Sequence, residues 1–260
     1  MTGIGNRPVA AVTGGSQGLG KGAALALGKA GFDVVVVDLT DDAKLQETLA
    51  GIRAYGVRAA FVQGDIADLD AQDALVEATW SAFDGIDCLV NNAGVPARPL
   101  RDLLEVKVEE FDRNLDINLR GTFFLTQKIA ARMIAARRDR FHRSIIVITS
   151  IAAGIVSLTR GEYCMSKAGL SMMTKLFAVR LAQDGILVHE IRPGLMRTEM
   201  TEGAAQETGR LIESGFTPVR RWGEPADVGA TISALATGAM PFTTGQPIFV
   251  DGGLHIHRVG

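Results

Sequence analysis

The sequence predicts an α/β fold in which seven parallel strands form a doubly wound sheet with helices on both faces. Three observations predict it. Short apolar runs alternate with longer helical patterns along the chain, several of the runs show no polar alternation, and clusters of Gly, Asn, Asp and Ser follow the runs. Uninterrupted apolar strands are typical of parallel sheets that are covered on both faces. Right-handed crossovers then place the connecting helices on the two sides.

Seven apolar runs are the expected strands, at 9–12, 32–37, 59–62, 86–90, 145–148, 186–191 and 247–250. The second of them is rich in valine, as expected for a strand that is buried on both faces. Helical patterns lie near 21–30, 43–54, 70–83, 103–135, 162–183 and 225–237. No linker, repeat or low-complexity segment divides the chain, and 260 residues can bury one sizeable core. We therefore expect a single domain over 1–260.

A glycine-rich turn joins the first expected strand to the first helix. Residues 13–20 read TGGSQGLG, with the spacing Gly-x3-Gly-x-Gly. Glycines let the backbone approach phosphates, and the following helix N-terminus offers free N–H groups and a partial positive charge. The flanking strand and helix favour a dinucleotide-binding, Rossmann-type turn over an ordinary glycine turn. The cofactor-binding residues expected here are Gly14, Ser16, Gln17, Gly18, Leu19 and Gly20.

Asp38 ends the second apolar run, 18 residues beyond Gly20. A carboxylate near this spacing accepts hydrogen bonds from the adenosine ribose hydroxyls and repels the 2′-phosphate of NADP. Leu39 follows it and Gln17 stands in the glycine turn, so neither position offers a cation to that phosphate. We therefore expect NAD rather than NADP. The alternative is that Asp38 only caps a helix.

Tyr163 and Lys167 lie four residues apart in an expected helix, which places both side chains on one face. A fixed ammonium beside a phenol favours the phenolate and lowers the tyrosine pKa from its usual value of about 10. The tyrosine can then move protons near neutral pH. This spacing also occurs in helices by chance, so its value comes from the glycine turn upstream. Together the two features predict a tyrosine that acts as an acid and base beside a bound dinucleotide.

The order and spacing of these motifs, from about Pro8 to Gly253, resemble those of the short-chain dehydrogenase/reductases. The further matching motifs are Gly64-Asp65-Ile66, Asn91-Asn92-Ala93-Gly94, Asn118, Ser150, Pro193-Gly194 and Asp251-Gly252-Gly253. Within that family the chain looks most like the group labelled 3-oxoacyl-(acyl-carrier-protein) reductase. Two positions depart from the pattern. His189 stands where the family commonly has Asn, and Asp184 stands where the acyl-carrier reductases place a basic residue.

The resemblance implies a role for each matching residue. Tyr163 is the expected general acid in reduction, and Lys167 is expected to lower its pKa and to hold the nicotinamide ribose. Ser150 is expected to hydrogen-bond the substrate oxygen, and Asn118 to hold a water that completes a proton relay to Lys167. The structural alternatives are a strand-end cap for Ser150 and a backbone-bonded polar residue for Asn118. Further cofactor contacts are expected from Asp65 and Ile66 at the adenine, from Asn92, Ala93 and Gly94 at the ribose, and from Pro193, Gly194 and Thr198 at the nicotinamide.

Substrate recognition is expected in the segment 195–222, which follows the sixth strand and is the expected lid. Gly203, Gly209 and Gly215 are its candidate hinges. The substrate-facing candidates are Ala152, Arg160, Glu162 and Arg197. Arg160 precedes the tyrosine closely and can clamp a carboxylate or phosphate, although an exposed loop arginine is the plainer interpretation.

Three functions remain open at this point. The first is an NAD-dependent reductase of 3-oxoacyl thioesters, and the second is an NAD-dependent dehydrogenase of a sugar, polyol or other small secondary alcohol. The third is a dinucleotide-sensing protein that has lost catalysis. The complete set Asn118, Ser150, Tyr163 and Lys167 argues against the third.

Composition excludes several other classes. The net charge of -2 offers no basic field for nucleic acid. No run of about 18 apolar residues and no signal peptide is present, so we expect a cytoplasmic protein without a membrane partner. Cys88 and Cys164 do not fit a metal spacing, and no metal is expected. The family resemblance implies a homotetramer, in which the helices near 103–135 and 162–183 pair between subunits.

Overall fold

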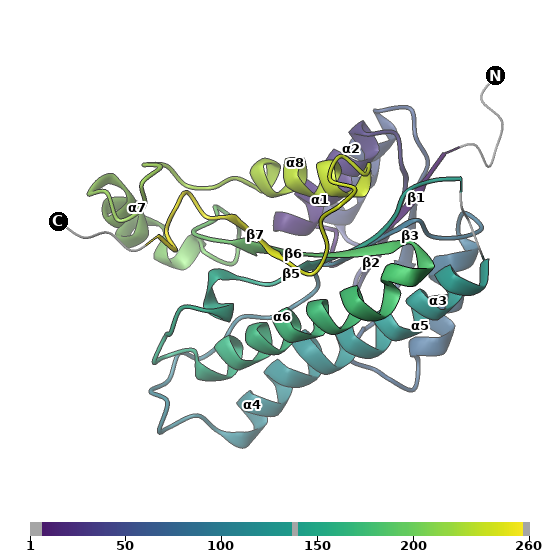
Figure 1. Cartoon of the computed structure of the whole chain (residues 1–260). Coiled ribbons are helices and arrows are strands. Elements are labelled where there is room, and N and C mark those ends of the chain that lie inside the picture. The colour runs from purple at the N-terminus through teal and green to yellow at the C-terminus, as the bar shows by residue number, and fades with distance from the viewer. Residues whose placement is uncertain (1–6, 137–139, 257–260) are drawn as a thin grey trace.

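Seven parallel strands form one sheet in the part of the chain that the structure, a computed structural model, describes, residues 7–136 and 140–256. Their order is β3-β2-β1-β4-β5-β6-β7, and the predicted fold class is confirmed (Figure 1). The strands are β1 (Val9–Thr13), β2 (Asp33–Asp38), β3 (Ala59–Gln63), β4 (Cys88–Asn91), β5 (Arg143–Ile148), β6 (Ile186–Pro193) and β7 (Pro247–Val250).

Helices cover both faces of the sheet (Figure 1). One face carries α1 (Gly18–Lys29), α2 (Ala43–Arg53) and α8 (Pro225–Ala236). The other carries α3 (Gln72–Ser81), α4 (Val108–Leu115), α5 (Thr122–Ala136) and α6 (Gly161–Leu181). The remaining α-helix of the described residues, α7 (Ala205–Glu213), lies beyond β7 and away from the sheet.

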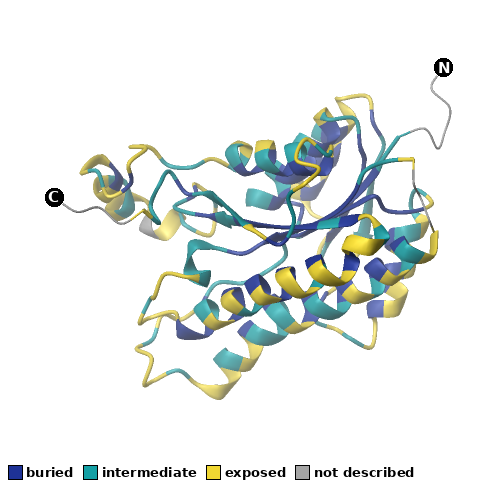
Figure 2. Ribbon diagram, in the orientation of Figure 1, coloured by how far each residue is buried: buried dark blue, intermediate teal, exposed yellow. Residues whose placement is uncertain are grey.

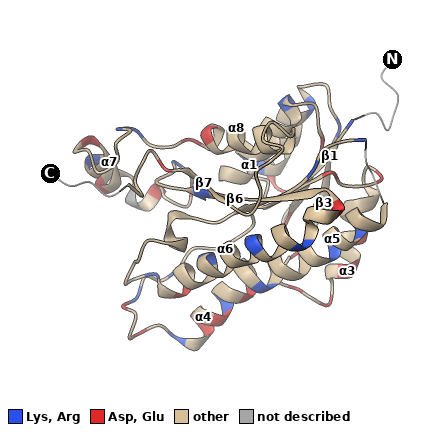
Figure 3. Ribbon diagram, viewed as in Figure 1, with Lys and Arg blue, Asp and Glu red and all other residues tan. Residues whose placement is uncertain are grey.

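Two apolar layers hold these helices to the sheet. Side chains alternate along a strand, so Ala10 and Val12 of β1 join the layer under α1 and α8, whereas Val9 and Ala11 join the layer with α5 and α6. The sheet is buried and the outer helix surfaces are exposed (Figure 2). Most charged side chains accordingly lie on helices and loops (Figure 3).

The direction of winding changes between β1 and β4, which are neighbours in the sheet. In doubly wound sheets, ligands bind beyond the carboxyl ends of the strands at this point. Because all the strands are parallel, the segments that follow β1, β2, β4, β5 and β6 meet at one edge. These segments carry the residues that the sequence singles out.

Two expected elements differ from the structure. The helix expected over 103–135 begins only at Val108, because the Asp102 carboxylate accepts the amide of Leu104 and its carbonyl accepts the amide of Glu105, which closes a turn. The same stretch contains a π-helical turn, Asp116–Gly121. In addition, α7 falls within a segment that the sequence indicates only as a lid. Most of its exposed residues are polar, Leu211 being an exception, and it buries Ile212.

No helix in the described residues is long and apolar enough to cross a bilayer. Residues 1–6, 137–139 and 257–260 of the expected 1–260 domain lie outside the described residues.

Candidate active site

The glycine turn follows β1 and leads into α1, as the sequence predicts. Gly14 and Gly18 have φ angles of 62° and 54°, a left-handed conformation that side chains with a Cβ rarely adopt. At Gly20 a Cβ would lie 1.9 Å from the Gly14 carbonyl oxygen and 2.5 Å from Asn92 Nδ2. The turn therefore has room only for glycine where the backbone must approach a phosphate closely. The N-terminus of α1 follows directly.

The segment after β4 fixes the shape of this turn. The Asn92 side-chain amide donates to the carbonyls of Thr13 (3.0 Å) and Gly14 (2.9 Å). In return, the Thr13 hydroxyl accepts the backbone amides of Asn92 and Ala93, each at 3.0 Å. Asn92 and Ala93 thus lie against the glycine turn. These residues fit a nucleotide cradle, because the left-handed glycines and the crowded Gly20 leave a cavity beside a helix N-terminus.

Asp38 sits at the end of β2 with its carboxylate turned toward the glycine turn. One carboxylate oxygen accepts the amide of Ser16 at 3.0 Å and the other accepts the amide of Leu39 at 2.8 Å. Lys44 of α2 lies nearby and donates to Gln17 Oε1 at 2.7 Å. Lys44 belongs to no motif of the sequence, and in the structure it brings a positive charge close to the turn.

A cavity of about 380 Å³ runs along the carboxyl ends of the strands and contains most of the predicted cofactor residues. The predicted residues that line it are Gly14, Gln17, Gly18, Leu19, Asp38, Asp65, Ile66, Asn92, Ala93, Gly94, Tyr163, Lys167 and Thr198. The lining does not include four other predicted cofactor residues, Ser16, Gly20, Pro193 and Gly194. Val95, Arg113, Ile117 and Met200 also line the cavity without having been predicted. Of these four residues, only Val95 directly follows a matching motif, at Gly94, so only its place in the cavity could have been predicted from the sequence.

Asn118 lies in the π-helical turn between α4 and α5, and it is fully buried. Its Oδ1 accepts the amide of Val95 at 2.7 Å, and its Nδ2 donates to the Val95 carbonyl at 3.0 Å and to Ser166 Oγ at 3.1 Å. A π-helical turn inserts one residue into a helix and re-aims the side chains around it. Here it directs Asn118 between the loop after β4 and the first turns of α6.

Ser150 follows β5 in an extended conformation and precedes a short 3-10 turn, Ile151–Ala153. Its Oγ accepts the amide of Ala152 at 3.1 Å, so it does cap that turn. A hydrogen bond between its hydroxyl and Tyr163 is also one of the influences on the pKa of Tyr163. The capping interpretation and the substrate-contact interpretation are therefore compatible for this residue.

Tyr163 and Lys167 lie on the same face of α6 and both line the cavity. Burial raises the pKa of the Tyr163 phenol, and the opposing hydrogen bond with Ser150 and charge of Arg160 have smaller effects. Lys167 Nζ donates to the Ile148 carbonyl at 3.1 Å and lies 5.6 Å from the centroid of the Tyr163 ring. Burial lowers the pKa of Lys167 to about 8.

The expectation of a lowered tyrosine pKa is therefore wrong for this structure. Desolvation of the phenol outweighs every attraction to a cation, and Lys167 is itself desolvated and bonded to a main-chain carbonyl. A phenol with a raised pKa is protonated at neutral pH. The raised pKa keeps the proton on Tyr163 and makes its phenol a weaker acid than an exposed one.

Pro193 ends β6, and Gly194 donates its amide to the Val250 carbonyl at 3.0 Å. A Cβ at Gly194 would lie 2.6 Å from the Asp251 Cβ, so this position is crowded by the segment after β7. Thr198 lines the cavity, and its amide donates to the Thr201 hydroxyl at 3.1 Å.

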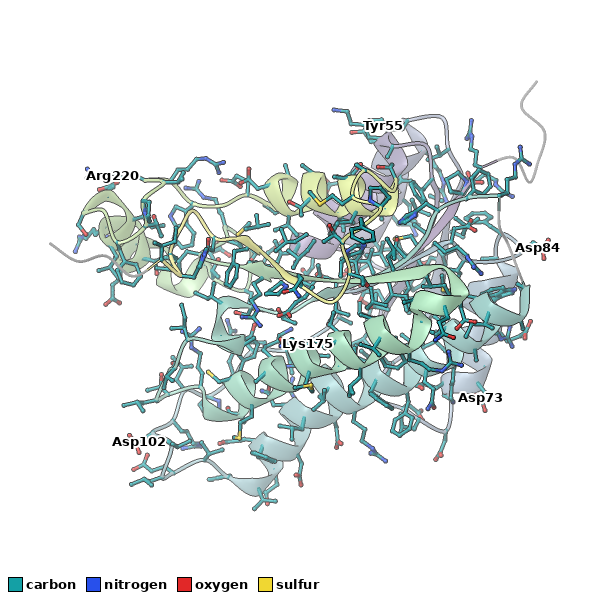
Figure 4. All side chains as sticks on the ribbon, viewed as in Figure 1. Tyr55, Asp73, Asp84, Asp102, Lys175 and Arg220 are labelled. Atoms are coloured by element: carbon teal, nitrogen blue, oxygen red, sulfur yellow. The ribbon has the colours of Figure 1, made fainter. Side chains whose placement is uncertain are left out.

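The two ends of the expected lid, 195–222, are pinned to each other. Arg197 donates its amide to the Gly223 carbonyl at 2.8 Å, and Gly223 donates its amide to the Leu195 carbonyl at 3.0 Å. Of the candidate hinges, Gly215 has a φ of 89°. Figure 4 shows the lid, marked by Arg220, and the loop after β4, marked by Asp102, at the same end of the molecule and on opposite sides of the sheet edge.

The four substrate candidates are placed differently. Glu162 lies in the first turn of α6 and is buried. Ala152 is adjacent to the Ser150 hydroxyl. Arg160 caps α6, is exposed, and donates to Ser157 Oγ at 3.3 Å. Arg197 is not brought together with Tyr163, because its side chain is 68% exposed and lies 3.7 Å from Glu224 at the start of α8.

Comparisons with known proteins agree with this geometry. A family model described as enoyl-(acyl carrier protein) reductase matches residues 14–255. The chain is 38% identical over 247 residues to a 3-oxoacyl-[acyl-carrier-protein] reductase of Synechocystis, covering 95% of this chain and 96% of that protein. It is 32% identical to an L-rhamnose 1-dehydrogenase (NAD(P)(+)) of Sphingomonas, covering 95% of each.

Among solved structures, a 3-oxoacyl-[acyl-carrier protein] reductase from Brucella melitensis in complex with NAD superposes with a TM-score of 0.94. The two chains are 45% identical, and the match covers 97% of this chain and 99% of the Brucella chain.

Proposed function

The chain belongs to the short-chain dehydrogenase/reductase family, and we propose that NAD(H) is its cofactor and a 3-oxoacyl thioester its substrate. It is an oxidoreductase that interconverts CH–OH and C=O groups and binds a nicotinamide dinucleotide. The observation that carries the proposal is that Tyr163 and Lys167 line the cavity beside the glycine turn, with the Ser150 hydroxyl hydrogen-bonded to Tyr163.

The proposed chemistry follows from these side chains. The nicotinamide, when bound, supplies the hydride. Tyr163 donates its phenolic proton to the carbonyl oxygen of the substrate, and Ser150 donates a hydrogen bond to the same oxygen as negative charge develops there. The Lys167 ammonium offsets part of the negative charge that remains on the phenolate after Tyr163 has given up its proton. In alcohol oxidation the same residues act in reverse.

Asn118 is proposed to hold the water that relays a proton to Lys167. Its support is positional, because its amide joins the loop after β4 to Ser166, the residue before Lys167. Gly94 lies between the two, since a Cβ there would be 2.9 Å from Asn118 Oδ1 and 3.7 Å from Lys167 Nζ. A larger residue at 94 would separate the ends of the relay.

The proposed preference for NAD rests on Asp38. Its carboxylate is anchored by the Ser16 and Leu39 amides at the side of the glycine turn where the adenosine ribose is expected. A 2′-phosphate in that place would meet a fixed negative charge at close range. Lys44 offsets part of this repulsion, since its ammonium lies 2.7 Å from the Gln17 side chain.

The proposed acyl substrate is supported by apolar side chains exposed around the mouth of the site. Leu103 and Leu104 follow β4, Val156 follows β5, and Phe216 and Val219 belong to the proposed lid, with exposed fractions between 50% and 93%. Because these segments follow the carboxyl ends of strands β4, β5 and β6, they border the same edge of the sheet. An exposed apolar rim fits an acyl chain better than it fits a sugar.

The second candidate is an NAD-dependent dehydrogenase of a sugar, polyol or other small secondary alcohol. It is favoured by the relative named as an L-rhamnose 1-dehydrogenase, which matches over 95% of the chain. The two candidates differ in the polarity of the substrate and share the reaction.

The deciding experiment is the rate of NADH oxidation, with NADPH in parallel, on a short 3-oxoacyl thioester. Turnover with NADH, and its loss in the variant Tyr163→Phe with NADH binding retained, is the expected result. No turnover on the thioester, with turnover on a sugar or polyol in the presence of NAD⁺, would instead establish the second candidate.

Assembly into a homotetramer is part of the proposal. The outer face of α6 exposes Met165, Met172, Leu176 and Val179, with exposed fractions of 47%, 54%, 59% and 80%. These residues are spaced 7, 4 and 3 apart, so they form one apolar stripe along the helix. A second copy of the chain would bury this stripe. We also propose that 1–260 is a single domain, because one seven-stranded sheet runs through the described residues, and that 195–222 is a substrate lid, because Thr198 and Met200 of this segment line the cavity.

A further inference from the structure

A buried carboxylate, Glu190 of β6, lies at the centre of a hydrogen-bonded cluster on the α6 side of the sheet. Its side chain is 0% exposed. Oε1 accepts the Thr149 hydroxyl at 2.7 Å and Arg192 Nε at 2.6 Å, and Oε2 accepts the Ser171 hydroxyl at 2.8 Å. Both oxygens are therefore satisfied, as a buried charge requires.

Arg192 closes the cluster from the side of β7. Its Nη2 donates to Ser171 Oγ at 2.7 Å, and its side chain is only 14% exposed. The guanidinium carbon lies 5.4 Å from the centroid of the Phe249 ring. At Gly154, a Cβ would be 3.3 Å from Arg192 Nη1, so the guanidinium also lies beside the end of the turn that starts at Ser150.

The cluster touches the neighbours of both proposed reacting side chains. Thr149 directly precedes Ser150, and its amide also donates to the Ile191 carbonyl at 2.9 Å. Ser171 stands four residues after Lys167 and eight after Tyr163, so it lies on the same face of α6. Glu190 therefore links the turn that carries Ser150 to the helix face that carries Tyr163, through one hydrogen bond on each side.

Stability alone gives little reason for such a cluster. Burying two charged groups carries a desolvation cost, and well-packed apolar residues of similar size are often equally stable in their place. The cluster instead fixes the positions of its side chains, because each hydrogen bond holds its two partners within a narrow range of distances. The Ser150 hydroxyl has to meet the same oxygen as Tyr163, which requires that kind of alignment.

We propose that Glu190, held by Arg192 and Ser171, is a positioning residue that fixes Ser150 relative to Tyr163. Glu190 does not line the cavity, and it acts through Thr149, which does. The inference rests on the proposed function, since it assumes that Ser150 and Tyr163 act on one carbonyl oxygen.

The test compares two isosteric changes of buried threonines. Thr149→Val removes the hydroxyl that Glu190 holds, whereas Thr174→Val, the control, removes a buried hydroxyl on α6 that bonds only to the Leu170 carbonyl. Thr149→Ser restores the hydroxyl, and Glu190→Gln removes the charge at the centre. The readouts are kcat and KM for the carbonyl substrate, the Kd of NADH, and amide hydrogen exchange over residues 149–154.

We expect Thr149→Val and Glu190→Gln to lower kcat about tenfold or more with the Kd of NADH unchanged, and to speed amide exchange over residues 149–154. Thr174→Val and Thr149→Ser should keep kcat within about twofold of the parent protein. The proposal is overturned if folded Thr149→Val keeps either the parent kcat or the parent exchange. If the parent protein reduces no carbonyl at all, the proposed function fails, and the exchange over 149–154 still decides whether the cluster positions Ser150.

Discussion

His189 makes the stability of this protein dependent on pH. The residue lies in the middle of β6, its side chain is 1% exposed, and neither ring nitrogen has a hydrogen-bond partner among the described residues. Burial lowers its pKa from 6.5 to about 4, and the charge of His142 adds to this effect. A histidine in this setting stays neutral in the folded chain down to about pH 4.

The sign and size of the effect follow from linkage. Between pH 6.5 and 4 the unfolded chain binds a proton at His189 that the folded chain does not, so stability falls as the pH falls through this window. A pKa difference of this size corresponds to about 3 kcal/mol over the whole window. Between pH 7 and pH 5 the expected loss from this residue is roughly 2 kcal/mol.

The variant His189→Asn tests this reasoning. Urea unfolding at pH 7 and pH 5 gives the stability lost on acidification, and this loss should be about 2 kcal/mol smaller in the variant than in the parent protein. Because the comparison is between the stability that each protein loses on acidification, any effect of the substitution that does not depend on pH cancels. Ser144→Ala, a buried change on the adjacent strand that removes no titrating group, should keep the parent loss. An equal loss in the parent and in His189→Asn would refute the assignment.

Three further predictions concern the cofactor, the glycine turn and the assembly. Asp38→Ser should raise the ratio of kcat/KM for NADPH to that for NADH about tenfold or more, since it removes the charge that opposes a 2′-phosphate; steady-state kinetics with both cofactors measures it. Gly20→Ala should lower the free energy of unfolding by about 1–3 kcal/mol and weaken NADH binding, because its Cβ would meet the Gly14 carbonyl. The control is Gly203→Ala, which has open space around it and should change the free energy of unfolding by less than about 0.5 kcal/mol. Leu176→Glu places a charge in the exposed stripe of α6 and should shift the mass measured by light scattering toward smaller species; an unchanged mass would place the subunit contact elsewhere.

The strands and the glycine turn were predictable because they depend on local physics. The run at 247–250 matches β7 residue for residue, and the φ angles of Gly14 and Gly18 are those that only glycine adopts readily. Parallel strands also bring their carboxyl ends together, so the gathering of Asn92, Ser150 and Tyr163 at one edge followed once the alternation of strands and helices was established.

The sequence mispredicts elements where a local feature leaves no trace in the hydrophobic pattern. The helix expected from 103 starts late because the Asp102 carboxylate captures the Leu104 amide, and a turn of three residues is invisible to a hydrophobic pattern. The helix α7 buries Ile212 among mostly polar residues, so the pattern there is too sparse to indicate it.

The sequence by itself determined the order of the elements, the conformations that require glycine, and the edge of the sheet at which the polar motifs meet. Only the tertiary structure decided the electrostatics at that edge. The Tyr163 pKa rises because packing removes water from the phenol, and Glu190 becomes a satisfied buried charge because Thr149, Ser171 and Arg192 converge on it from separate segments. Periodicity and backbone preference are properties of neighbours along the chain, whereas desolvation and hydrogen-bond geometry are properties of neighbours in space.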